Sequence, residues 1–178
     1  TIATNINRLL IVCVSLQGNA SEVINSVKLG TTNMTQATSV TPDGYSCMSE
    51  IWYLIAPAEG AGTVHVNTTH SAGTLAWTVG AYAFYHADQS TGIGVVATNG
   101  NDPSAGNPTV PITPTTTGSW ILDCQTALIA GAPVASQTQA WNKVPVATVY
   151  QFSQYDSTPT ISSSNPLTWT ATARFNSC

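Results

Sequence analysis

Short apolar runs, rich in β-branched residues, alternate along the chain with turns that contain Gly, Pro and Asn. Residues 8–16 are apolar at both odd and even positions, which predicts a central strand buried on both faces. Residues 23–29 alternate, with Val23 and Val27 on one face and Ile24 on the other, and residues 63–69 place Val64 and Val66 inward. Helical spacing of apolar residues is not sustained over three turns in any segment. The pattern therefore predicts an all-β protein.

Further strands follow from the same reading. Residues 35–40 predict a weaker strand, residues 47–55 a strong one, and residues 74–87 one bent strand or two. Residues 120–128, 143–152 and 167–175 each alternate and predict strands, the first with Asp123 and Gln125 on one face. Residues 91–118 predict long loops around one short edge strand, because four prolines interrupt them: Pro103, Pro108, Pro111 and Pro114.

The number and spacing of these strands indicate how they are arranged. About eight to ten strands separated by long turns predict a two-sheet antiparallel β-sandwich of jelly-roll type. An immunoglobulin-like sandwich is the alternative, although the Cys, Trp, Cys pattern of that fold is not convincing here. A chain of 178 residues can build one complete sandwich and is too short for two ordinary domains. We therefore expect a single domain over residues 1–178.

The composition limits the partners and the location that we expect for this chain. Charged residues make up 7% of the chain, whereas a typical soluble domain has about 25%. With a net charge of −4 and four cations in all, the chain has little with which to neutralise phosphates, so we expect no nucleic-acid partner. Its longest apolar run, residues 9–14, is much shorter than a membrane helix, and we expect no membrane span. The start at Thr1 fits a processed chain whose signal peptide has been removed, and we expect an extracellular or cell-surface protein.

Cysteines and glycosylation triplets fit that setting. The four cysteines show no C-x-x-C spacing and no neighbouring His, which favours two disulfides over a zinc site and leaves three pairings open: Cys13, Cys47, Cys124 and Cys178. Three Asn-x-Ser/Thr triplets are candidate glycosylation sites, although a chain rich in Asn, Ser and Thr also forms such triplets by chance: Asn19, Asn33 and Asn67.

Several motifs together resemble a known module. They are residues 7–12 (Asn-Arg-Leu-Leu-Ile-Val) with Val14-Ser15, then residues 23–30, residues 50–54 (Glu-Ile-Trp-Tyr-Leu) with Ala56-Pro57, Gly62-Thr63-Val64, and residues 87–91 (Ala-Asp-Gln-Ser-Thr). Over roughly the first two thirds of its length the chain resembles a β-sandwich module of secreted bacterial, archaeal and phage surface proteins. The resemblance implies a jelly-roll module of adhesins, fibres and appendages, with no shared catalytic residues.

The sequence also lacks the patterns of known catalytic sites. It contains no Gly-x-Ser-x-Gly elbow, phosphate-binding loop or Cys-His nucleophile pattern, and its carboxylates are scattered. His65 and His70 lie five positions apart, an odd separation, so a strand would place them on opposite faces, which argues against a metal site with His86. We therefore expect neither enzymatic activity nor a cofactor or metal.

Self-assembly is the function that this composition favours. The chain lacks the Lys-rich edges by which soluble sandwiches avoid edge-to-edge pairing. In residues 1–7, Ile2, Thr4 and Ile6 fall on one face, as in a short strand that completes a neighbour's sheet. We expect an extracellular homopolymer joined through β-strand edges: a filament, pilus-like fibre or surface layer. The alternative for residues 1–7 is the first edge strand of their own domain.

The second functional hypothesis is a carbohydrate-binding adhesin or a viral or phage surface module. Aromatic rings can stack on sugars while polar side chains bind the hydroxyl groups. Aromatic residues in or near polar stretches are the candidate glycan contacts: Tyr45, Trp141, Tyr150 and Tyr155. The alternative for these four residues is ordinary packing in the core or at its rim, as is expected for the tryptophans that lie in strand-like runs: Trp52, Trp77, Trp120 and Trp169.

Overall fold

A computed structural model of the chain describes residues 1–18, 22–41, 47–69, 76–99, 109–129, 132–146, 149–170 and 174–177. Within these ranges the regular structure is entirely β, without a helix. The strands are β1 (Leu9–Gln17), β2 (Val23–Leu29), β3 (Thr32–Asn33), β4 (Thr35–Val40), β5 (Cys47–Ile55), β6 (Val64–Thr69), β7 (Ala76–Phe84), β8 (Thr109–Ile112), β9 (Ile121–Leu122), β10 (Gln125–Ile129), β11 (Val134–Ala135), β12 (Thr138–Val146), β13 (Val149–Asp156), β14 (Asn165–Thr170) and β15 (Arg174–Ser177).

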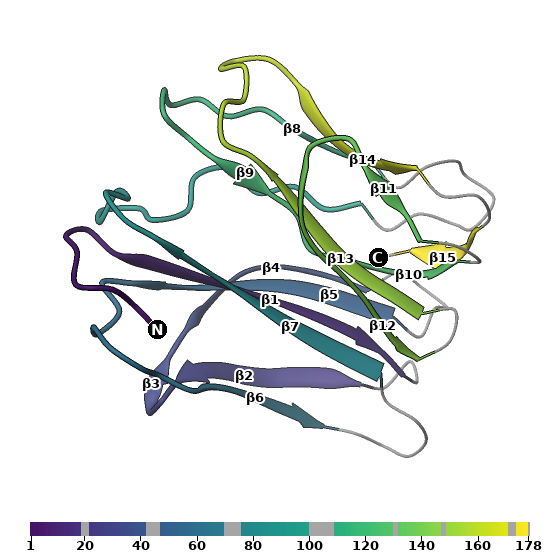
Figure 1. Cartoon of the computed structure of the whole chain (residues 1–178), viewed down its shortest axis with the longest axis horizontal. Coiled ribbons are helices and arrows are strands. Elements are labelled where there is room, and N and C mark those ends of the chain that lie inside the picture. Colours follow the sequence, from purple (N-terminus) through teal and green to yellow (C-terminus); the bar gives the residue numbers. More distant parts are fainter. Residues whose placement is uncertain are drawn as a thin grey trace.

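The described strands form antiparallel sheets in a sandwich-like arrangement (Figure 1). There are four hydrogen-bonded sheets rather than the expected two, with strand orders β4-β5-β1-β7, β12-β13-β10-β15, β11-β14-β8 and β3-β2-β6, and β9 pairs with β13. The sheet β4-β5-β1-β7 is the middle layer, because it packs against β3-β2-β6 on one face and contacts β10, β12 and β13 on the other. The prediction of an all-β antiparallel sandwich is confirmed at this level.

Strand β1 forms the centre of the middle layer, as its two apolar faces predict. It pairs with β5 from Leu9↔Ile55 to Gln17↔Cys47, and on its other side with β7. Every residue of β1 except Gln17 is buried. One face of β1 packs into the larger apolar core between the middle layer and β3-β2-β6, which includes Leu10, Val12, Val14, Leu16, Ile24, Val27, Met48 and Trp52.

A bulge in β2 changes the predicted faces of that strand. The register of β2 against β6 shifts between Ile24 and Ser26, since a bulge places an extra residue in one strand. As a result, Ile24 and Val27 are both buried, whereas Val23 is 48% exposed. The predicted shared face of Val23 and Val27 is therefore wrong. The alternation in β6 is confirmed, with Val64 and Val66 partly buried in the same core.

Three predicted strands are divided in the structure. Residues 143–152 contain the end of β12 and the start of β13, and residues 167–175 contain the end of β14 and the start of β15. Apolar alternation continues across both connections, so the pattern gave no sign of a break. Residues 120–128 form β9 and β10, which both pair with β13 in one continuous register from Ile121↔Asp156 to Leu128↔Val149. The short strand expected within residues 91–118 is β8, at the edge of its sheet.

Candidate functional site

Four aromatic side chains form a row that crosses from the middle layer to the layer above it. Tyr82 and Phe84 lie on one face of β7, Trp120 precedes β9, and Tyr155 lies on β13 beside β9. The ring centroids of Tyr82 and Phe84 are 6.3 Å apart. Phe84 meets Trp120 edge to face at 5.5 Å, and Trp120 stacks on Tyr155 at 5.5 Å with 13° between the ring planes. We call these four residues the aromatic row.

Trp120 is the exposed member of the aromatic row. It is 52% exposed, although a large aromatic ring normally gains free energy by leaving water. Trp77 on β7 is similarly exposed, at 51%, whereas Trp52 is buried. Of the tryptophans in strand-like runs, Trp52 thus packs in the core and Trp77 and Trp120 do not, while the side chain of Trp169 lies outside the described residues.

A groove with a volume of about 1130 Å³ runs beside the aromatic row, and both Phe84 and Trp120 line it. Its apolar lining includes Leu9 and Ile11 of β1 and Ile51 of β5. Its polar lining is mostly side-chain amides and hydroxyls, including Asn5, Asn7, Thr115, Thr116, Thr117 and Ser119, with the carboxyl groups of Asp88 and Asp123 and the imidazole of His86. A stacking surface next to hydrogen-bonding groups is the combination found in sites for small polar ligands.

Asp88 lines the groove, and its carboxylate accepts hydrogen bonds from residues of its own turn. Its carboxylate accepts hydrogen bonds from Ser90 Oγ at 2.7 Å, from the Ser90 amide at 2.8 Å and from Thr91 Oγ1 at 2.7 Å. These hydrogen bonds lower the pKa of Asp88 to about 2, and those from Ser90 have the largest effect. The carboxylate is therefore ionised at neutral pH and holds the loop that follows β7 in shape.

The structure brings one of the predicted glycan contacts, Tyr155, to this groove region through its stacking on Trp120. Trp141 instead packs over Gly80 of β7, since a Cβ atom at Gly80 would overlap the indole ring of Trp141. Tyr150 packs against the small core of Ala127 and Phe152. Tyr45 lies outside the described residues.

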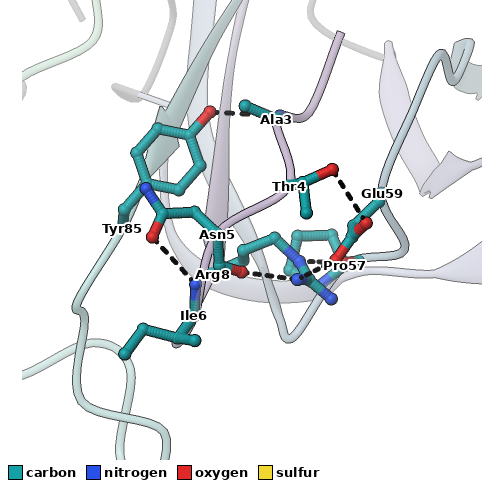
Figure 2. Close-up of polar contacts among 8 residues, drawn as sticks. All are labelled: Ala3, Thr4, Asn5, Ile6, Arg8, Pro57, Glu59 and Tyr85. Carbon is teal, nitrogen blue, oxygen red and sulfur yellow. Dashed lines mark hydrogen bonds and ion pairs between the residues drawn. The ribbon is translucent and has the colours of Figure 1, made fainter.

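The N-terminal segment, residues 1–7, is held by its own chain (Figure 2). Backbone hydrogen bonds of 2.8 Å join Ile2 and Gly60 in both directions. Thr4 Oγ1 donates to Glu59 Oε2 at 3.0 Å, and the Ala3 amide donates to the Tyr85 hydroxyl at 3.2 Å. Ile2 is 7% exposed within the larger apolar core, whereas Ile6 is 63% exposed. The expectation that Ile2, Thr4 and Ile6 share one face is therefore wrong, because the segment forms a single bridge instead of a strand.

Arg8 connects this segment to the loop after β5. Its guanidinium forms an ion pair with Glu59 at 2.8 Å and also donates to the carbonyl oxygens of Pro57, at 2.8 Å, and Asn5, at 2.5 Å (Figure 2). Asn7 has a positive φ of 52°, which turns the chain into β1. The basic side chain thus ties together the two loops that carry Asn5 and Glu59.

Cysteines and glycosylation triplets are placed as follows. Cys47 is disulfide-bonded, Cys13 and Cys124 carry free, buried thiols, and Cys178 lies outside the described residues. Two of the predicted glycosylation sites, Asn33 on β3 and Asn67 on β6, are exposed and lie opposite Lys28 and Ser26 of β2. They therefore share the outward face of the β3-β2-β6 sheet, and Asn19 lies outside the described residues.

Among the described residues, no group of three His, Cys, Asp or Glu side chains could hold a metal ion. The same part of the chain has no helix with the length and apolar character needed to cross a bilayer. Comparison of the chain with models of protein families, with curated proteins and with solved structures finds no match. Its function is therefore inferred from the geometry of the groove and of the sheet edges.

Proposed function

We propose that this chain is a non-enzymatic, extracellular surface module of jelly-roll type that binds glycans in the groove beside the aromatic row. The observation that carries the proposal is Trp120, which is half exposed at the groove and held in place by Tyr155 and Phe84. A ring fixed by two aromatic neighbours loses little conformational entropy when a ligand stacks on it. The apolar face of a sugar ring matches such a surface.

The charges of the groove indicate which glycans it would accept. The described lining contains no Lys or Arg, and its basic side chain is His86, so a sulfate, phosphate or carboxylate on the sugar would find no permanently charged cationic partner there. Asp88 is ionised and would repel such groups. Amide and hydroxyl side chains such as Asn7 and Thr115 can donate to and accept from sugar hydroxyl groups. A neutral oligosaccharide is therefore the proposed ligand class.

A pair of tryptophan variants tests this proposal. Trp120 and Trp77 have nearly equal exposure, but Trp77 is not among the groove residues, which makes Trp77→Ala the matched control for Trp120→Ala. On an array of neutral and acidic glycans, the parent chain and Trp77→Ala should bind the same neutral glycans. Trp120→Ala should weaken binding about tenfold, the scale expected when one stacked aromatic contact is lost. Equal binding by both variants, or a preference for acidic glycans, would contradict the proposal.

A second candidate function is a structural subunit that forms a filament, pilus-like fibre or surface layer. The observation that favours it is the chemistry of the sheet edges. Strands β4 and β7 border the middle sheet and β6 borders the outer sheet, and none of these three strands contains Lys, Arg, Asp or Glu. Uncharged edges lack a common protection against pairing with another chain. Contacts of this kind between head and tail would produce an open polymer.

In this second proposal, edge pairing is better supported than donation of the N-terminal segment. Donation would break the Ile2 bridge to Gly60 and the ion pair between Arg8 and Glu59. Negative-stain electron microscopy and sedimentation of the parent chain, without any glycan, test for a polymer. Filaments that disappear on deletion of residues 1–7, with the monomer still folded, would support donation. Filaments that persist would support edge pairing, and single particles in every preparation would contradict a structural subunit.

A further inference from the structure

Two buried thiols meet between the middle layer and the β12-β13-β10-β15 sheet. Cys13 lies on β1 and is fully buried, and Cys124, which is 9% exposed, immediately precedes β10. Cys13 Sγ is 3.9 Å from the carbonyl oxygen of Asp123, and Cys124 Sγ is 3.2 Å from Ser15 Oγ. Cys13 therefore contacts the residue next to Cys124, and Cys124 contacts the residue two positions from Cys13.

The interface around this thiol pair is polar, in contrast to the apolar core on the other face of the middle layer. Gln151 Nε2 donates to the Ser15 carbonyl oxygen at 2.9 Å, and the hydroxyl groups of Ser49 and Thr126 are 3.2 Å apart. Hydrogen bonds of this kind each contribute only about 1 kcal/mol net to stability. The two layers are therefore joined here mainly by polar contacts, and a covalent link would add a constraint that the packing does not supply.

We propose that Cys13 and Cys124 form a disulfide that joins these two layers when the chain folds in an oxidising compartment. With glutathione disulfide as oxidant, one cysteine thiolate attacks it, forms a mixed disulfide and releases one glutathione thiolate. The second cysteine thiolate then attacks the protein sulfur of that mixed disulfide and releases the second glutathione. Two protein thiols are oxidised, one glutathione disulfide is reduced to two glutathiones, and the two protons pass to the glutathione thiolates.

Burial determines the stage of folding at which this disulfide can form. Hydrogen bonding to Cys124 and burial raise the pKa of the Cys13 thiol well above its ordinary value, so the reactive thiolate is scarce in the folded dithiol. An external oxidant also cannot reach a sulfur with no exposed surface. The exchange is therefore expected during folding, and the native dithiol should resist oxidation. Because Cys13 and Asp123 are 110 residues apart in sequence, the bond would close a long loop in the unfolded chain.

Refolding the full chain under two redox conditions tests the proposal. One sample refolds in a glutathione redox buffer and the other in excess reducing agent, and both are alkylated in denaturant before non-reducing peptide mapping. The oxidised sample should contain a linked peptide that joins Cys13 and Cys124, about 2 Da lighter than the sum of its two reduced peptides. Alkylation of both cysteines in the oxidatively refolded sample, or their linkage to other cysteines, would overturn the proposal.

A second measurement separates a structural bond from an incidental one. In a chain that carries Cys13→Ala and Cys124→Ala, the disulfide at Cys47 remains available, so this variant isolates the proposed bond. For the parent chain, the equilibrium constant of unfolding should be roughly 30-fold or more lower in the oxidised than in the reduced sample. The double variant keeps the disulfide at Cys47, so its difference between the oxidised and reduced samples should be smaller than that of the parent chain by a factor of roughly 30 or more. If the double variant does not fold, the peptide map of the parent chain still tests the proposal, because it reports directly whether Cys13 and Cys124 are linked.

Discussion

Replacing Ile2 with alanine should destabilise the domain, because the structure places this residue in the apolar core. Ile2 is 7% exposed and packs with the core between the middle layer and β3-β2-β6. The substitution removes three carbon atoms, and at about 0.8 kcal/mol for each buried methylene the transfer contribution is about 2.4 kcal/mol. A cavity would add to this loss, although a segment near the chain end can partly close it. We expect the free energy of unfolding to fall by about 2 to 3 kcal/mol.

Ile6→Ala is the matched control, since it is the same substitution four positions further along the same segment. Ile6 is 63% exposed, so its loss should change the free energy of unfolding by less than about 0.5 kcal/mol. Urea unfolding followed by tryptophan fluorescence and circular dichroism measures both variants, which should share the slope of the parent chain. For a domain of this size, Ile2→Ala should lower the melting temperature by about 4 to 12 °C.

Equal effects of the two substitutions would refute this reasoning. They would mean that residues 1–7 are not held by their own domain in solution, whatever the bridge to Gly60 contributes. A stable Ile2→Ala monomer that no longer forms polymers would instead point to Ile2 acting in a neighbouring subunit. The experiment therefore also distinguishes anchoring of the segment from its donation.

Three further predictions follow from individual contacts. Gly80→Ala should lower the melting temperature, because its Cβ would overlap Trp141, whereas Gly94→Ala, with no atom within 4 Å of its Cβ, should not; thermal unfolding measures both. Burial raises the pKa of Glu50. The contribution of Glu50 to stability is therefore full below the ordinary carboxyl pKa and is lost as pH rises through the raised pKa. Glu50→Gln should remove this part of the pH dependence of the unfolding free energy. The pKa of Asp88 is lowered to about 2. The contribution of Asp88 to stability is therefore present above the ordinary carboxyl pKa and is lost as pH falls toward 2. Asp88→Asn should reduce this loss of stability at acidic pH, measured in the same titration.

The candidate site could be predicted only in part. Tyr155 was placed among the candidate glycan contacts because it lies in a polar stretch, and it does stack on Trp120. The alternation of residues 120–128 places Trp120 inside a predicted strand, whereas in the structure it precedes β9 and is half exposed. Its aromatic neighbours, Phe84 and Tyr155, lie on strands that are distant from it in sequence, so a local pattern has no signal for this arrangement. A Gly-Ser pair directly before Trp120 was the one local sign that the strand had not yet begun.

The sequence alone determined where most of the early strands lie and which of them is central. The limits of β2, β4 and β5 agree with the ranges that the sequence predicts, and β1 is buried on both faces as its pattern requires, because strand periodicity is a local property of successive residues. Only the tertiary structure decided the bulge in β2, the division of the strands into four sheets, the docking of Ile2 and the meeting of Cys13 with Cys124. Each of these depends on contacts between residues far apart in the chain, for which a local pattern has no signal.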